Sequence, residues 1–132
     1  MDPFHLPPTP LTPEVSLNPE KGLLSLRGES YPEHVLTFYA PILETIKAML
    51  EESKLTLLRV EMHITYYNSA SAKAFHRIFQ MLNKAAENGC AIHLFWQFDE
   101  EDDMARDLGN DIQEDFPAIQ VVGVQMATAS LS

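Results

Sequence analysis

The stretch that decides the fold is residues 54–88, which read KLTLLRVEMHITYYNSASAKAFHRIFQMLNKAAEN. Its first part, Lys54 to Tyr67, alternates apolar and polar residues, which predicts a strand with one buried face. One face carries Leu58, Val60, Met62, Ile64 and Tyr66, and the other carries Arg59, Glu61, His63, Thr65 and Tyr67. From Ser69 to Asn88 the apolar residues recur every three to four positions, which predicts an amphipathic helix that stops at Asn88-Gly89.

The segments on either side of this strand and helix show the same two patterns. We expect further strands at 14–17, 22–27, 91–98 and 119–124, and further helices at about 32–52 and 101–115. Ser30 or Tyr31 would cap the first helix, and Pro41 should kink it or split off its first turn. The resulting order β-β-α-β-α-β-α-β predicts a single α/β domain, in which a mixed, mostly parallel sheet packs against helices.

The two ends of the chain differ in composition from this central part. Residues 1–13 hold five prolines, which predicts an extended arm. We therefore expect residues 14–125 to form the domain and residues 126–132 to form a loose tail.

Charge and composition exclude several classes of function. The chain of 132 residues has a net charge of −10, and residues 99–115 hold nine acids against one base, Arg106. Such a charge repels phosphate backbones and anionic lipids, so we expect no binding to nucleic acid or membranes. A single cysteine, Cys90, and a start without a secretory signal favour a cytoplasmic protein.

The sequence lacks the motifs of enzymatic chemistry, so we expect that the protein is not an enzyme and binds no cofactor. The sequence has no glycine-rich phosphate loop, no nucleophile elbow and no histidine pair at zinc-ligand spacing. His63 and His93 are interpreted as hydrogen-bonded structural residues. The acidic run 99–103 has two interpretations: a solvated helix start, or a site for a hard cation.

The most informative segment is Tyr66 to Lys73, which joins the clearest strand to the clearest helix. A helix N-terminus leaves backbone N–H groups without partners, and Asn68, Ser69 or Ser71 could cap them. Alternatively, one of the two serines could accept a phosphate, which the helix N-terminus would stabilise. The residues by themselves leave both interpretations open.

The chain resembles the SiaC family of bacterial regulatory phosphoproteins, which are similar to the anti-sigma-factor antagonists of the STAS fold. The resemblance rests on four short stretches that occur in the same order: residues 10–13 (PLTP), 28–33 (GESYPE), 67–71 (YNSAS) and 98–104 (FDEEDDM). The family pattern Asn-Thr-Ser-Ser reads Asn68-Ser69-Ala70-Ser71 in this chain, so Ser69 keeps an acceptor hydroxyl.

The resemblance implies a STAS-like fold and a phosphorylation-switched adaptor. The unmodified protein would bind and regulate a diguanylate cyclase, in cyclic di-GMP and biofilm signalling. A cognate kinase would phosphorylate Ser69, which releases the partner, and a PP2C-type phosphatase would remove the phosphate. Partner-binding residues would be Tyr67, Asn68 and Ser71, bordered by Tyr31, Pro32 and Glu33.

Two other functions remain as alternatives. The first is a module like an anti-sigma-factor antagonist, whose target is an anti-sigma kinase. The second is a metal-dependent hydrolase that uses the acidic run 99–103.

Overall fold

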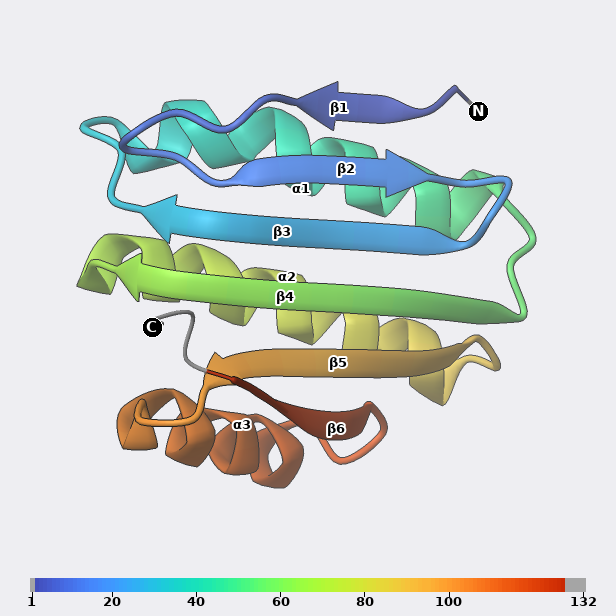
Figure 1. The fold of residues 1–132 in the computed structure, drawn as a ribbon. Helices are drawn as coiled ribbons and strands as arrows, with labels where there is room; N and C mark the ends of the chain where they lie inside the picture. The colour runs from blue at the N-terminus through green and yellow to red at the C-terminus, as the bar shows by residue number, and fades with distance from the viewer. Residues whose placement is uncertain (1, 128–132) are drawn as a thin grey trace.

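The computed structural model describes residues 2–127, which form a two-layer α/β domain (Figure 1). In chain order the described elements are β1 (Phe4–Leu6), β2 (Glu14–Asn18), β3 (Leu23–Ser30), α1 (Val35–Glu52), β4 (Leu57–Tyr67), α2 (Ser69–Glu87), β5 (Ala91–Asp99), α3 (Asp103–Asp115) and β6 (Gln120–Met126). This arrangement confirms the predicted α/β class.

The strands lie in the sheet in the same order as in the chain. The β1–β2 and β2–β3 pairs are antiparallel, whereas β3–β4, β4–β5 and β5–β6 are parallel, so the sheet is mixed and mostly parallel, as predicted. Each parallel crossover moves one strand further in the same direction. Right-handed crossovers of this kind place their helices on one face of the sheet. In Figure 1, α1 and α2 accordingly lie side by side behind the sheet.

The hydrophobic core lies between the sheet and these helices. Every second side chain of β4 from Leu58 to Ile64 faces the helices and is at most 5% exposed, which matches the period-two pattern of the sequence. They pack with apolar residues of the inner faces of α1 and α2, among them Ile42, Ile46, Met49, Ile78 and Leu82.

α3 is held on the sheet by a close contact between Trp96 and Gly109. The indole of Trp96 is 2% exposed, and its Nε1 donates a 2.7 Å hydrogen bond to the carbonyl oxygen of Ala105. A Cβ atom on Gly109 would lie only 2.7 Å from Cδ1 of Trp96. The helix can therefore approach the ring this closely only because residue 109 has no side chain.

The open face of the sheet carries a polar network centred on Glu61. Its carboxylate accepts hydrogen bonds of 2.7 Å from both Arg59 and Arg27, and Arg27 also donates to Gln97 at 2.7 Å. These bonds, chiefly that from Arg59, hold the pKa of Glu61 below its usual value. The guanidinium of Arg59 also lies 4.1 Å from the centre of the Phe95 ring, a cation–π contact.

Two details of the predicted element order are wrong. The order lacked β1, which lies inside the proline-rich stretch 1–13 and pairs with β2. The first helix begins at Val35 rather than near Pro32, and its N-cap is His34 rather than Ser30 or Tyr31, because β3 extends to Ser30 and residues 31–34 form the connection to the helix. α1 continues through Pro41 without a split, since its inner face is buried against the sheet on both sides of that residue.

A β-bulge in β4 changes the predicted faces of the two tyrosines that end the strand. Gly28 pairs with Ile64 but Glu29 pairs with Tyr66, so Thr65 has no counterpart in the ladder. Beyond the bulge the alternation is reversed. Tyr67 therefore packs on Phe75 of α2, with ring centres 5.9 Å apart, while Tyr66 is 54% exposed.

The tail predicted at 126–132 begins at the last residue of β6, and residues 128–132 lie outside the described part of the chain.

Candidate functional site

The candidate site is the junction between β4 and α2, where one residue separates the strand from the helix. Asn68 has an extended backbone (φ −93°, ψ 170°), and its Oδ1 accepts a 2.8 Å hydrogen bond from the backbone N–H of Ser71. Asn68 is therefore the N-cap. Ser69 is the first residue of α2, and its side chain is exposed. The capping role does not consume its hydroxyl, which makes no hydrogen bond to any residue within 2–127.

Ser71 points in the opposite direction and is fully buried. Its hydroxyl accepts a 2.8 Å hydrogen bond from Ser30, and the Ser30 hydroxyl lies 2.5 Å from that of Tyr39. The backbone N–H of Asn68 also donates to the carbonyl oxygen of Ser30 at 3.1 Å. This chain of hydroxyls joins the end of β3, the inner face of α1 and the first turn of α2. Burial raises the pKa of Tyr39 to about 12, although the hydrogen bond with Ser30 lowers it in part.

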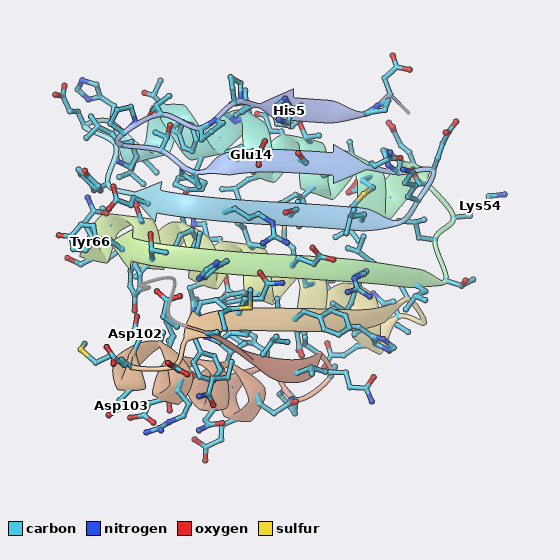
Figure 2. All side chains as sticks on the ribbon, in the orientation of Figure 1. His5, Glu14, Lys54, Tyr66, Asp102 and Asp103 are labelled. Atoms are coloured by element: carbon cyan, nitrogen blue, oxygen red, sulfur yellow. The ribbon has the colours of Figure 1, made fainter. Side chains whose placement is uncertain are left out.

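Three tyrosines lie on the two chain segments that meet at this junction. Tyr67 is half-buried, and burial, with a smaller effect from the charge of Asp102, raises its pKa. Tyr66 and Tyr31 meet edge to face, with ring centres 5.2 Å apart. Figure 2 shows Tyr66 at the same end of the sheet as Asp102 and Asp103. The sequence did not indicate Tyr66 as a site residue, because only the bulge brings it to the surface beside Tyr31.

The residues predicted for the site thus separate into two layers. The surface layer holds Ser69 and Glu33, which are exposed, with the partly exposed Tyr31, Tyr67 and Asn68. The side chains of Ser71 and Pro32 are buried, so they support this surface from below and do not reach it.

An exposed serine hydroxyl at a capped helix start is accessible to a modifying enzyme. Residues 6–126 match the model of the SiaC family of regulatory phosphoproteins. The chain belongs to the SiaC family. The resemblance carried by the four short stretches of sequence is thereby confirmed.

Relatives of this family member come from Pseudomonas aeruginosa. One, from strain UCBPP-PA14, is named only as an uncharacterized protein; it is 29% identical over 123 residues, which cover 91% of this chain and 97% of the relative. The solved structure of SiaC of Pseudomonas aeruginosa is 25% identical, with a TM-score of 0.82 over 97% of this chain and 100% of that one.

A third similarity is to a chain in the crystal structure of the diguanylate cyclase SiaD in complex with its activator SiaC, also from Pseudomonas aeruginosa. That chain is 24% identical, with a TM-score of 0.87 over 93% of this SiaC-family chain and 99% of the solved one. At this identity the likeness shows a shared fold.

The acidic run 99–103 of this SiaC-family chain is divided among separate structural roles. Asp99 ends β5 and lies 3.2 Å from Nε2 of His63, while Asp102 caps α3 by accepting from the N–H of Ala105 at 3.0 Å. Asp103 pairs with Arg106 at 3.4 Å in the first turn of α3. Within residues 2–127, no three histidine, cysteine, aspartate or glutamate side chains converge as metal ligands would.

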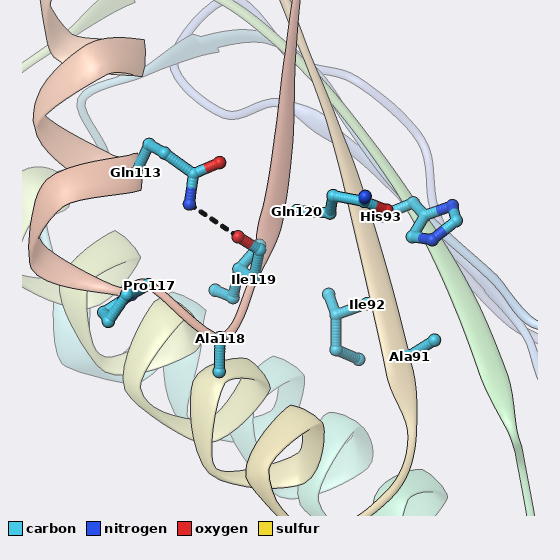
Figure 3. A pocket seen from close by; sticks show the side chains of 8 residues that line it. All are labelled: Ala91, Ile92, His93, Gln113, Pro117, Ala118, Ile119 and Gln120. Atoms are coloured by element: carbon cyan, nitrogen blue, oxygen red, sulfur yellow. Dashed lines mark hydrogen bonds between the residues drawn. The ribbon is translucent and has the colours of Figure 1, made fainter.

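A hollow at the other end of the sheet does not belong to this site. It has a volume of about 480 Å³ and lies where β5 and β6 begin, bordered by Ile92, His93 and Pro117 (Figure 3). One of its polar groups, the side-chain amide of Gln113, is already hydrogen-bonded to the backbone, because it donates to the carbonyl oxygen of Ile119 and accepts from the N–H of Val121. Within residues 2–127, no helix combines the length and the apolar character needed to cross a bilayer.

Proposed function

We propose that this SiaC-family protein is a phosphorylation-switched adaptor that binds and regulates a diguanylate cyclase, and that phosphorylation of Ser69 releases the cyclase. The observation that supports it most directly is the exposed Ser69 hydroxyl at the start of α2, beside a cap that Asn68 already provides. The complex of the diguanylate cyclase SiaD with its activator SiaC supports the class of partner.

The chemistry of the switch is carried out by two other enzymes. A cognate kinase would transfer the γ-phosphoryl group of ATP to Ser69 Oγ, which loses its proton as ADP leaves. A PP2C-type phosphatase would hydrolyse this ester: water supplies an oxygen to the inorganic phosphate that leaves, and Ser69 regains its hydroxyl. In this proposal the chain supplies only the acceptor hydroxyl, and the use of ATP favours a cytoplasmic cycle.

The fold tolerates the phosphate better than the complex does. A phosphate on Ser69 adds a charge of about −1.5 to −2, which the positive end of the α2 dipole stabilises in the free protein. In the complex, the same group would lie in the interface next to Tyr67 and Asn68, and it would have to lose water. The phosphate therefore weakens binding without unfolding the domain.

The experiment compares the unmodified protein, Ser69→Ala and the kinase-treated protein in binding to the cognate cyclase. Ser69→Ala should bind constitutively, while the phosphorylated protein should bind tens to thousands of times more weakly, a loss of about 2–4 kcal/mol. Circular dichroism should show that all three proteins are folded, and peptide mass spectrometry should place the phosphate on Ser69. Equal affinity of the three forms, or phosphate on Ser71, would refute the proposal.

A further inference from the structure

A continuous groove runs between α1 and α2 on the side of the helices that faces away from the sheet. It consists of three hollows with volumes of about 380, 430 and 550 Å³. The first two share Leu43 and Arg77, and the last two share Lys47 and Met81. We call this continuous surface the helix groove. It follows α2 from Ala70 to the end of the helix at Glu87, a length of about 27 Å for 18 residues.

The helix groove combines an apolar floor with cationic edges. Leu36, which is 78% exposed, Leu43 and Met81 supply apolar surface along it. Five of the nine lysines and arginines of the chain line it: Lys47, Lys54, Lys73, Arg77 and Lys84. Only two acids, Glu44 and Glu51, stand among them, so the helix groove has a net charge of +3 in a chain whose total charge is −10.

These five cations are also without ionic partners, which separates them from the arginines elsewhere in the fold. Arg27 and Arg59 pair with Glu61, and Arg106 pairs with Asp103. The cations of the helix groove are exposed and form no ion pair with any residue in 2–127. Within residues 2–127, five of the six lysines and arginines without an ion pair, all except Lys21, thus lie on one apolar groove, which makes this surface complementary to an anionic, partly apolar ligand.

We propose that the helix groove is the docking site for an amphipathic helix with acidic flanks, supplied by the partner protein. A groove that follows five turns of α2 has a length suited to a single helix, whose apolar residues at three- to four-residue spacing would lie on the floor. Its acids would lie against the lysines and Arg77. This inference rests on the proposed function, because it assigns the surface on which the cyclase is bound.

The helix groove begins beside the switch residue Ser69, so a phosphate on Ser69 can act directly on a helix bound in the groove. Ala70 and Lys73 line its first hollow, and Lys73 follows Ser69 by four residues on the same helix. Side chains four residues apart on a helix are neighbours. A phosphate on Ser69 therefore neutralises Lys73 and places negative charge at the mouth of the helix groove, where it repels an acidic helix.

The test uses two charge-reversal variants of the full chain. The groove variant is Lys73→Glu with Arg77→Glu, and the control is Lys21→Glu with Arg106→Glu, which makes the same change of charge outside the helix groove. All four residues are exposed, so both variants should fold, which circular dichroism and thermal unfolding will check. The probes are two helical 18-residue peptides with leucine on one face and either glutamate or lysine on the flanks.

Fluorescence anisotropy should show that the wild type and the control bind the glutamate peptide. The groove variant should bind it about tenfold more weakly, and the affinity should fall as salt rises. The lysine peptide should bind weakly to all three proteins. Equal binding of the two peptides, or full binding by the groove variant, would overturn the inference. So would loss, in the groove variant alone, of binding to phosphatidylserine vesicles or of self-association in sedimentation, since either would assign the surface to a lipid or to a second copy.

A parallel measurement with the cognate cyclase separates this inference from the proposed function. If the wild type binds the cyclase and the groove variant binds it equally well, the helix groove is not the docking site, while the adaptor function stands. If no form binds the cyclase but the peptides behave as expected, the proposed function fails and the helix groove remains a site for an acidic helix.

Discussion

Replacing Tyr39 with phenylalanine tests the buried hydroxyl chain that positions the switch segment. The substitution removes only the hydroxyl, which lies 2.5 Å from that of Ser30, and it keeps the ring and its edge contacts with Phe38 and Phe75. Tyr39 is 1% exposed, so no water replaces the lost bond. At pH 7 we expect the free energy of unfolding to fall by about 1 kcal/mol, the net value of one hydrogen bond.

The same substitution should reverse its effect at high pH. Burial raises the pKa of Tyr39 from 10.0 to about 12, so folding favours the protonated phenol. The resulting contribution of Tyr39 to the free energy of unfolding is complete below pH 10 and is lost as the pH rises through 12. Through the titration of Tyr39, the free energy of unfolding of the wild type should fall by about 1.4 kcal/mol by pH 11 and approach a fall of about 2.7 kcal/mol above pH 12. The Tyr39→Phe protein has no phenol at this position, so its free energy of unfolding does not change for this reason.

Urea unfolding of the two proteins at pH 7, 9, 10 and 11 measures the difference directly, because other groups titrate alike in both. Tyr39→Phe should be the less stable protein at pH 7 and the more stable one above about pH 11. The control substitution Tyr66→Phe removes an exposed hydroxyl, so it should change the free energy of unfolding little at pH 7. A difference between the wild type and Tyr39→Phe that stays constant from pH 7 to 11 would refute the reasoning.

Two further substitutions test the packing of α3 and the network on the open face. Gly109→Ala would put a methyl group 2.7 Å from the buried Trp96 ring, so it should destabilise the fold by about 1–3 kcal/mol and shift the tryptophan fluorescence. Asn110→Ala, at the exposed neighbouring position, should do neither, and an unchanged melting temperature for Gly109→Ala would contradict the packing argument. Glu61→Gln should be less stable than the wild type at pH 7, because Arg59 and Arg27 lower the pKa of Glu61 and so stabilise the folded state above its ordinary value of 4.5. The difference between the urea midpoints of the two proteins should shrink as the pH falls below 4.5 and through the lowered pKa of Glu61; a difference that stays constant from pH 7 to pH 3 would count against the ionic contribution.

Periodic patterns within one segment made much of the fold predictable. The period of two in 57–67 and the period near 3.6 in 69–87 are local properties, and the structure has β4 and α2 there. β1 was not predictable in the same way, because a strand of three residues has no measurable period. Its existence depends on pairing with β2, which is a contact between segments. The helix predicted from Pro32 likewise began later, since pairing with β4 keeps Ser30 in β3.

In the candidate site, too, some features follow from local sequence and others from contacts between segments. The sequence by itself placed Ser69 and Ser71 at the start of a helix and associated them with a phosphoprotein family, because strand-to-helix changes and short motifs are local. It left open which serine faces solvent. The tertiary structure decided this, since Ser71 is buried by Ser30 and Tyr39, which come from two other elements. The bulge that exposes Tyr66 and the helix groove between α1 and α2 also arise only when segments pack, because burial and charge proximity belong to pairs of surfaces and not to a single stretch of chain.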